Sequence, residues 1–169
     1  MKQLKLQAYQ EEPELLLWIG DFFSFHEALI LSEQKEPSPA YVAEAKEILE
    51  KWQEEKSCLF MLYQGNTPVG FVRLVFRGPQ VPWLEELYIA PDFRRQGLGT
   101  QAIYLVEDWL KKESSAEALC LDVVPRNREA LYLYHKLGFV DLSLVTLRKE
   151  FGTSCRNTPV ELLGKTFHM

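Results

Sequence analysis

Residues 84–100 read LEELYIAPDFRRQGLGT, and this stretch predicts a strand, a basic glycine loop and the start of a helix. Gly97 and Gly99 let the backbone turn tightly and come close to a ligand. The amide groups of such a loop gather at the N-terminus of the following helix, where an anion binds favourably. Arg94 and Arg95 add positive charge. The stretch therefore predicts an anion-binding loop.

A second segment, residues 127–139, reads NREALYLYHKLGF. It resembles the Asn-x-x-Ala-x-x-x-Tyr-x-x-x-Gly-Phe element of the GNAT acetyltransferases, and residues 94–99 match that superfamily's Arg/Gln-x-x-Gly-x-Gly/Ala signature. The resemblance covers roughly residues 58–150. A chain of 169 residues fits one domain, so we expect a single domain over residues 1–169. The resemblance implies that this is an acetyltransferase domain with acetyl-CoA as its cosubstrate.

Apolar periodicity and turn residues predict an α/β (α+β layered) fold with helices on the faces of a mixed sheet. The GNAT-like form of this fold has a mostly antiparallel central sheet of six or seven strands, flanked by about four helices. A helical region up to residue 32 is expected as one helix, or as two that are broken near Gly20. The other expected helices are 39–56, with Ser38 as N-cap, 100–112 and 127–137, and the expected strands are 4–6, 58–63, 69–76, 84–89, 118–123, 139–150 and 160–167.

Composition narrows the classes of function. A net charge of −5 and a pI near 5.3 argue against general nucleic-acid binding. No run approaches the roughly 20 apolar residues of a membrane span, and no long apolar leader opens the chain, so we expect a cytoplasmic protein without membrane contact. Three cysteines without a Cys-x-x-Cys pair and three scattered histidines predict no metal site.

The resemblance assigns the coenzyme A pyrophosphate to the glycine loop. A dinucleotide-binding fold is the competing interpretation, because residues 97–102 also fit Gly-x-Gly-x-x-Ala and Asp122 follows about 20 residues on. Too little chain remains after Asp122 for the second half of that fold, and no Gly-Lys-Ser/Thr of a P-loop is present. The expected coenzyme-binding residues are Leu87, Tyr88, Ile89, Arg94, Arg95, Gln96, Gly97, Leu98, Gly99, Thr100 and Asn127.

Tyr134 occupies the tyrosine position of the second motif, which in the family directs its hydroxyl at the coenzyme sulfur. We therefore expect Tyr134 to act as general acid, although an aromatic residue at this helical spacing is also a common core residue. Glu85 and Glu86 face opposite ways on a strand, so at most one of them reaches a cleft. Glu86 is the expected base for the amine, with a water chain as the alternative, and a backbone N–H within 87–89 is expected to steady the oxyanion.

These residues predict direct acetyl transfer to a primary amine of a small molecule or a peptide. The alternative is a non-catalytic acyl-CoA-binding or sensing module on the same fold, since a fold alone does not establish chemistry. Gly152–Pro159 is expected to be a loop that joins the last strand to the core or to a partner subunit, which leaves a homodimer open.

Overall fold

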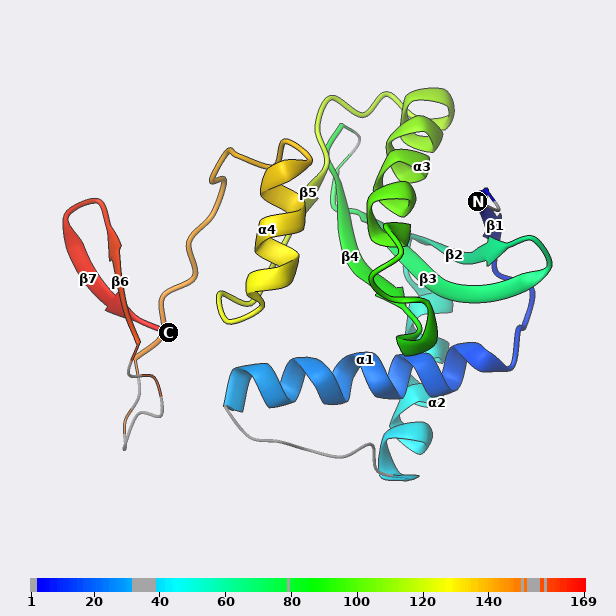
Figure 1. Cartoon of the computed structure of the whole chain (residues 1–169), viewed down its shortest axis with the longest axis horizontal. Helices are drawn as coiled ribbons and strands as arrows, with labels where there is room; N and C mark the ends of the chain where they lie inside the picture. The colour runs from blue at the N-terminus through cyan, green and yellow to red at the C-terminus, as the bar shows by residue number, and fades with distance from the viewer. Residues whose placement is uncertain (1–2, 32–38, 79, 150, 152–155, 157) are drawn as a thin grey trace. The chain divides into compact units, whose positions relative to one another are not determined.

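Five strands form one sheet in the order β1-β2-β3-β4-β5 (Figure 1). The computed structural model describes residues 3–31, 39–78, 80–149, 151, 156 and 158–169. Strands β1 to β4 are antiparallel to their neighbours, and β5 runs parallel to β4. This confirms the predicted mixed, mostly antiparallel sheet, with five strands in place of six or seven. The strands are Leu4–Ala8 (β1), Ser57–Gln64 (β2), Thr67–Phe76 (β3), Pro82–Ile89 (β4) and Cys120–Leu121 (β5).

The chain divides into two compact units. The N-terminal unit comprises Met1–Phe25 and Glu36–Asp122 and holds the sheet, whereas the C-terminal unit comprises His26–Lys35 and Val123–Met169. The described helices are Glu14–Leu31 (α1), Pro39–Glu54 (α2), Leu98–Glu113 (α3) and Arg128–Lys136 (α4), with a short 3-10 turn at Pro91–Phe93 (η1).

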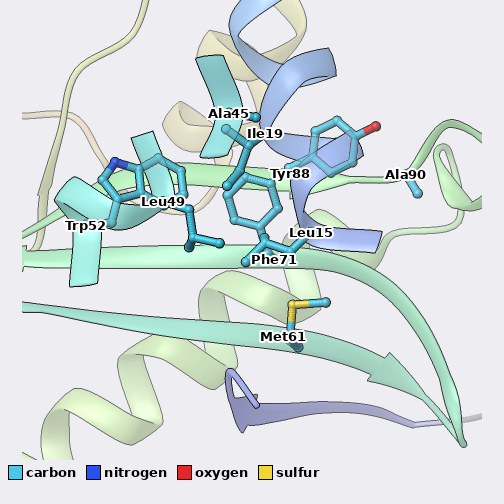
Figure 2. Close-up of a cluster of buried hydrophobic side chains, with 9 residues drawn as sticks. All are labelled: Leu15, Ile19, Ala45, Leu49, Trp52, Met61, Phe71, Tyr88 and Ala90. Carbon is cyan, nitrogen blue, oxygen red and sulfur yellow. The ribbon is translucent and has the colours of Figure 1, made fainter. Parts of the chain in front are cut away.

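One face of the sheet is covered by α1 and α2 (Figure 2). The ring of Phe71 stacks on Tyr88 with 5.6 Å between centroids, and its centroid lies 6.0 Å from that of Trp52. Burying this much aromatic surface supplies a large share of the apolar stabilisation of a domain this size. The cluster consists of Leu15, Ile19, Ala45, Leu49, Trp52, Met61, Phe71, Tyr88 and Ala90.

Helix α3 covers the opposite face of the sheet. Trp109 meets Phe60 of β2 edge to face, with 5.0 Å between ring centroids. Ala102, Val106 and Leu110 are buried, as the helical spacing of residues 100–112 predicts. Because β4 lies between α3 and the two other helices, its residues are held from both sides, and the glycine loop that follows β4 starts from a rigid strand.

Gly70 lies on β3 opposite Ile89, at the end of β4 from which that loop leaves. A Cβ atom at this position would sit 2.0 Å from the carbonyl oxygen of Tyr88. We therefore expect Gly70→Ala to lower the free energy of unfolding by about 2–3 kcal/mol, because backbone must move to admit it. Urea unfolding measures this, with Gly78→Ala as control, since a Cβ there meets nothing within 4 Å. Equal stability of the two variants would contradict the expectation.

Most predicted elements are confirmed to within a few residues. Of the two alternatives for the first helical region, the structure has a single helix, and α1 runs unbroken through Gly20. Two details are wrong. Residues 139–149 form neither helix nor strand, and the expected last strand at 160–167 is a hairpin of Pro159–Leu162 (β6) with Lys165–His168 (β7). The pattern of residues 139–149 favours extended backbone, but a strand also requires a neighbouring edge. The expected N-cap Ser38 and most of the 152–159 loop lie outside the described residues.

The C-terminal unit is far less densely packed than the sheet. None of its described side chains is fully buried, and Leu142, Leu144 and Leu147 are 78%, 69% and 69% exposed. Within this unit, Arg126 donates to the carbonyl oxygen of Leu29 at 3.3 Å. Carbonyls at a helix C-terminus lack intrahelical partners, so Arg126 caps this end of α1.

Candidate functional site

The glycine loop leaves β4 through the 3-10 turn η1, in which the amide of Arg94 donates to the carbonyl of Pro91 at 3.2 Å. Arg95 and Gly97 then take left-handed φ angles of 63° and 75°. A left-handed residue other than glycine costs about 1–2 kcal/mol, and such strain is most often found at functional sites. Two left-handed residues within three positions reverse the chain, so that α3 starts at the end of β4.

The N-terminus of α3 is open to an anion. Its N-cap is Gly97, which offers no side chain to the first amides, and the first intrahelical bond runs from Gln101 to the carbonyl of Gly97 at 3.2 Å. The amides of Leu98, Gly99 and Thr100 therefore lack intrahelical acceptors. A Cβ on Gly97 would meet nothing within 4 Å, so the loop is open there. Free amides and the dipole of a 16-residue helix together favour a bound phosphate.

The edge of β4 beside the loop is also open. β5 pairs with β4 only at Trp83 and Leu84 among the described residues. The amide of Ala90 donates to Val69 of β3, so alternate residues along the strand direct the amides of Leu87 and Ile89 away from β3. The amide of Tyr88 faces β3 instead. Of the three residues predicted to supply an oxyanion donor, Leu87 and Ile89 thus present their N–H groups at the unpaired edge.

Arg94 is folded back on β4. Its Nε donates to the carbonyl of Ile89 at 2.8 Å, and its guanidinium carbon lies 5.4 Å from the centroid of the Tyr88 ring. Gln96 donates to the carbonyl of Asp92 at 3.3 Å. Both side chains therefore stabilise the loop itself. Their direct contact with a coenzyme, like that of Arg95, stays a prediction.

Glu86 is buried and ion-paired. Its carboxylate accepts two bonds from Arg73, at 2.6 Å from Nε and 3.2 Å from the second terminal nitrogen, and Arg73 also reaches Glu55 at 2.9 Å. The Arg73 guanidinium lies 4.5 Å from the centroid of the Trp52 ring. Burial raises the pKa of Glu86, and the Arg73 partner opposes that shift. A carboxylate with both oxygens bound to arginine is poorly placed to take a proton, so the role of Glu86 as base stays a prediction.

Arg73→Met is expected to destabilise the fold by about 3 kcal/mol at neutral pH, because it leaves Glu86 buried without its cation. This loss of stability arises only while the Glu86 carboxylate is charged. Without Arg73 the remaining influences raise the pKa of Glu86, so the penalty appears as pH rises through that raised pKa and shrinks as pH falls toward the ordinary value of 4.5.

Urea unfolding at several pH values tests this. The matched control is Arg77→Met, because Arg77 pairs with Glu85 at 2.6 Å but is 47% exposed. That exposed pair is expected to contribute about 1 kcal/mol or less. A pH-independent loss for Arg73→Met, or equal losses for both variants, would contradict the expectation.

Tyr134 and Asn127 lie on and before α4, in the C-terminal unit. Asn127 accepts a bond from the amide of Ala130 at 3.2 Å, which confirms it as the helix cap. The Tyr134 ring packs edge to face on Phe139, with 5.7 Å between centroids, and burial raises the pKa of Tyr134 to about 12. Tyr132, two residues earlier, is 74% exposed. The catalytic role of Tyr134 and the coenzyme contact of Asn127 stay predictions.

Two residues that organise the site in the N-terminal unit were not predicted from the sequence. Asp21 accepts a bond from the Tyr88 hydroxyl at 2.5 Å, and Arg73 holds Glu86. Asp21 is one acid in an otherwise apolar helix face, and a lone acid or arginine carries no spacing pattern. The available signal was charge in an apolar run, since a buried charge requires a partner.

Comparison with known proteins identifies the family. Residues 23–139, more than half of the chain, match the model of the acetyltransferase (GNAT) family. The chain belongs to this family. Among curated relatives, streptothricin acetyltransferase A of Bacillus subtilis is 26% identical over 52% of this chain and 50% of its own length. The chain spans half or less of the length of the first curated relatives it matches.

Solved structures share the GNAT fold. A putative acetyltransferase (YycN) of Bacillus subtilis superposes with a TM-score of 0.67 at 17% identity, covering 89% of this chain and 100% of that one. Spermidine N-acetyltransferase from Vibrio cholerae, in complex with CoA and spermine, gives 0.62 at 20% identity, covering 82% of this chain and 81% of that one. At these identities the likeness establishes the fold.

No described helix has the length and apolar content needed to cross a membrane. Within the described residues, no group of three or more His, Cys, Asp or Glu side chains is arranged to hold a metal ion.

Proposed function

We propose that this protein is an N-acetyltransferase that moves the acetyl group of acetyl-CoA directly to a primary amine, and that its two units form one domain over residues 1–169. The observation that carries the proposal is the α3 N-terminus, where Gly97 offers no side-chain cap and three amides lack intrahelical acceptors. A diphosphate fits this set of donors. The thioester of the cosubstrate supplies the activated acetyl group.

The open edge of β4 supplies the second part of the proposed mechanism. Negative charge develops on the acetyl oxygen as the amine attacks, and preorganised amides stabilise such charge. The N–H groups of Leu87 and Ile89 lie on the edge that β5 leaves free. Tyr134, whose pKa is raised to about 12, stays protonated and donates its proton to the departing sulfur of the coenzyme.

The amine must lose a proton before or during attack. Because both oxygens of Glu86 bind Arg73, we favour the water chain as the route for this proton, with Glu86 keeping β3 and β4 in register beside it. A direct role for Glu86 remains the alternative.

We propose a small-molecule or peptide amine as acceptor. The support is the naming of relatives and neighbours for streptothricin and spermidine. We also propose that the protein is cytoplasmic and that it forms a homodimer. The support for the homodimer is that a second copy of the chain would bury the exposed apolar side chains of residues 140–147.

Isothermal titration calorimetry with CoA, followed by thiol-release assays against a panel of amines, tests the proposal. Binding followed by turnover is the expected result. Binding without turnover on any amine would favour the non-catalytic sensing module, and absence of CoA binding would contradict both.

A further inference from the structure

Asp21 of α1 joins the helix to the glycine loop through one carboxylate oxygen. The Tyr88 hydroxyl donates to Oδ2 of Asp21 at 2.5 Å, and a terminal nitrogen of Arg94 lies 3.7 Å from the same oxygen. Tyr88 belongs to β4 and Arg94 is the first residue after η1. Three segments of the N-terminal unit therefore meet at a single carboxylate.

Arg94 makes two further contacts, and both fix it to the end of β4. Its Nε donates to the carbonyl of Ile89 at 2.8 Å, and its guanidinium lies over the Tyr88 ring. The carbonyl of Ile89 faces the edge where β5 no longer pairs. Arg94 thus provides the hydrogen bond that a neighbouring strand would otherwise supply, and the point at which the chain leaves β4 is fixed.

We propose that Asp21 is a positioning residue for the glycine loop: it holds Arg94 against the end of β4, and Arg94 in turn sets the course of the loop toward the α3 amides. The inference deepens the proposed function and rests on it for its consequence in coenzyme affinity. Asp21 offsets the charge of Arg94, so the contribution of Arg94 to anion binding is made through loop geometry.

The left-handed Arg95 follows directly and explains why such an anchor is needed. A strained residue persists only when its surroundings over-determine its conformation. Arg94 is anchored on one side of the turn, and Leu98, which is 2% exposed, is buried on the other. Arg95 and Gly97 therefore lie between two fixed residues. If the anchor at Arg94 is lost, the strained turn relaxes, and the amides of residues 98–100 lose their common direction.

A double-mutant cycle of Asp21→Asn and Arg94→Gln tests the inference, with Asp108→Asn on the exposed face of α3 as matched control. Asparagine keeps an oxygen for the Tyr88 hydroxyl. The first readout is amide hydrogen exchange of peptides covering residues 90–101 in the coenzyme-free protein, where the amides of Phe93, Arg94 and Gln101 are hydrogen-bonded. The second is the Kd of CoA by calorimetry.

We expect Asp21→Asn to speed exchange in this segment and to weaken CoA about fivefold, and Arg94→Gln to do the same. The double variant should be no worse than the stronger single one, because both act through one contact. Unchanged exchange in Asp21→Asn would overturn the inference, as would additive losses or tighter CoA binding, either of which would make Arg94 a direct coenzyme ligand. Since exchange is measured without coenzyme, it decides the role of Asp21 even if the wild-type protein binds no CoA.

Discussion

Gly97→Asp is expected to weaken CoA binding by about a hundredfold or more, which corresponds to about 2.8 kcal/mol. The new carboxylate would lie among the amides that hold the diphosphate, so two like charges would meet. The left-handed φ of 75° adds strain for any residue with a Cβ. Calorimetric titration with CoA is the measurement.

Two further variants separate the causes. Gly97→Ala carries the strain without the charge, so it should fall between wild type and Gly97→Asp. Gly78→Asp adds the same charge at an open position between β3 and β4 and should leave the Kd unchanged. If Gly97→Asp bound CoA like wild type, the pyrophosphate would have to bind elsewhere.

Tyr134→Phe is expected to lower kcat by about 100-fold or more while the KM for acetyl-CoA changes little, because a general acid acts only as the thiolate leaves. Tyr132→Phe is the matched control, since that ring is 74% exposed and lies two positions away on the same helix. Steady-state kinetics with an accepted amine measures both variants.

The raised pKa of Tyr134 also predicts how kcat depends on pH. An acid works in its protonated form, and with a pKa of about 12 Tyr134 keeps its proton throughout the neutral and mildly alkaline range. Between pH 7 and pH 10, deprotonation of Tyr134 should therefore cause no loss of kcat in the wild-type enzyme. The pH dependence of kcat in Tyr134→Phe should be the same over this range. Equal kcat for wild type and Tyr134→Phe would exclude the tyrosine as acid.

The sheet and its helices follow from the sequence because local pattern and burial agree in the N-terminal unit. The β-forming residues within 58–76 and the stripe through Ala45, Leu49 and Trp52 both contribute to one core. Residues 139–149 differ, since their pattern specifies extended backbone without specifying the edge that pairs with it. Of the two alternatives at Gly20, the unbroken helix forms because Ile19 is fully buried in the core and packing outweighs the propensity of one glycine.

Some features of the candidate site could likewise be predicted from the sequence, and others could not. Backbone features, namely the glycine loop and the N-terminus of α3, could be predicted because glycine spacing determines where the chain turns. Side-chain pairs between distant segments could not. Asp21 and Tyr88 are 67 residues apart, and Arg73 and Glu86 are 13 apart on different strands, so only the register of β3 and β4 and the docking of α1 bring them together.

The central claim is that amides at the start of α3 hold the diphosphate of the coenzyme. Amide NMR spectra recorded during a CoA titration test it most directly. The account predicts that the amides of Gly97, Leu98, Gly99 and Thr100 show the largest shifts and that pantetheine, which lacks the diphosphate, leaves them nearly unchanged. Saturable CoA binding that shifts other amides and leaves these four in place would contradict it.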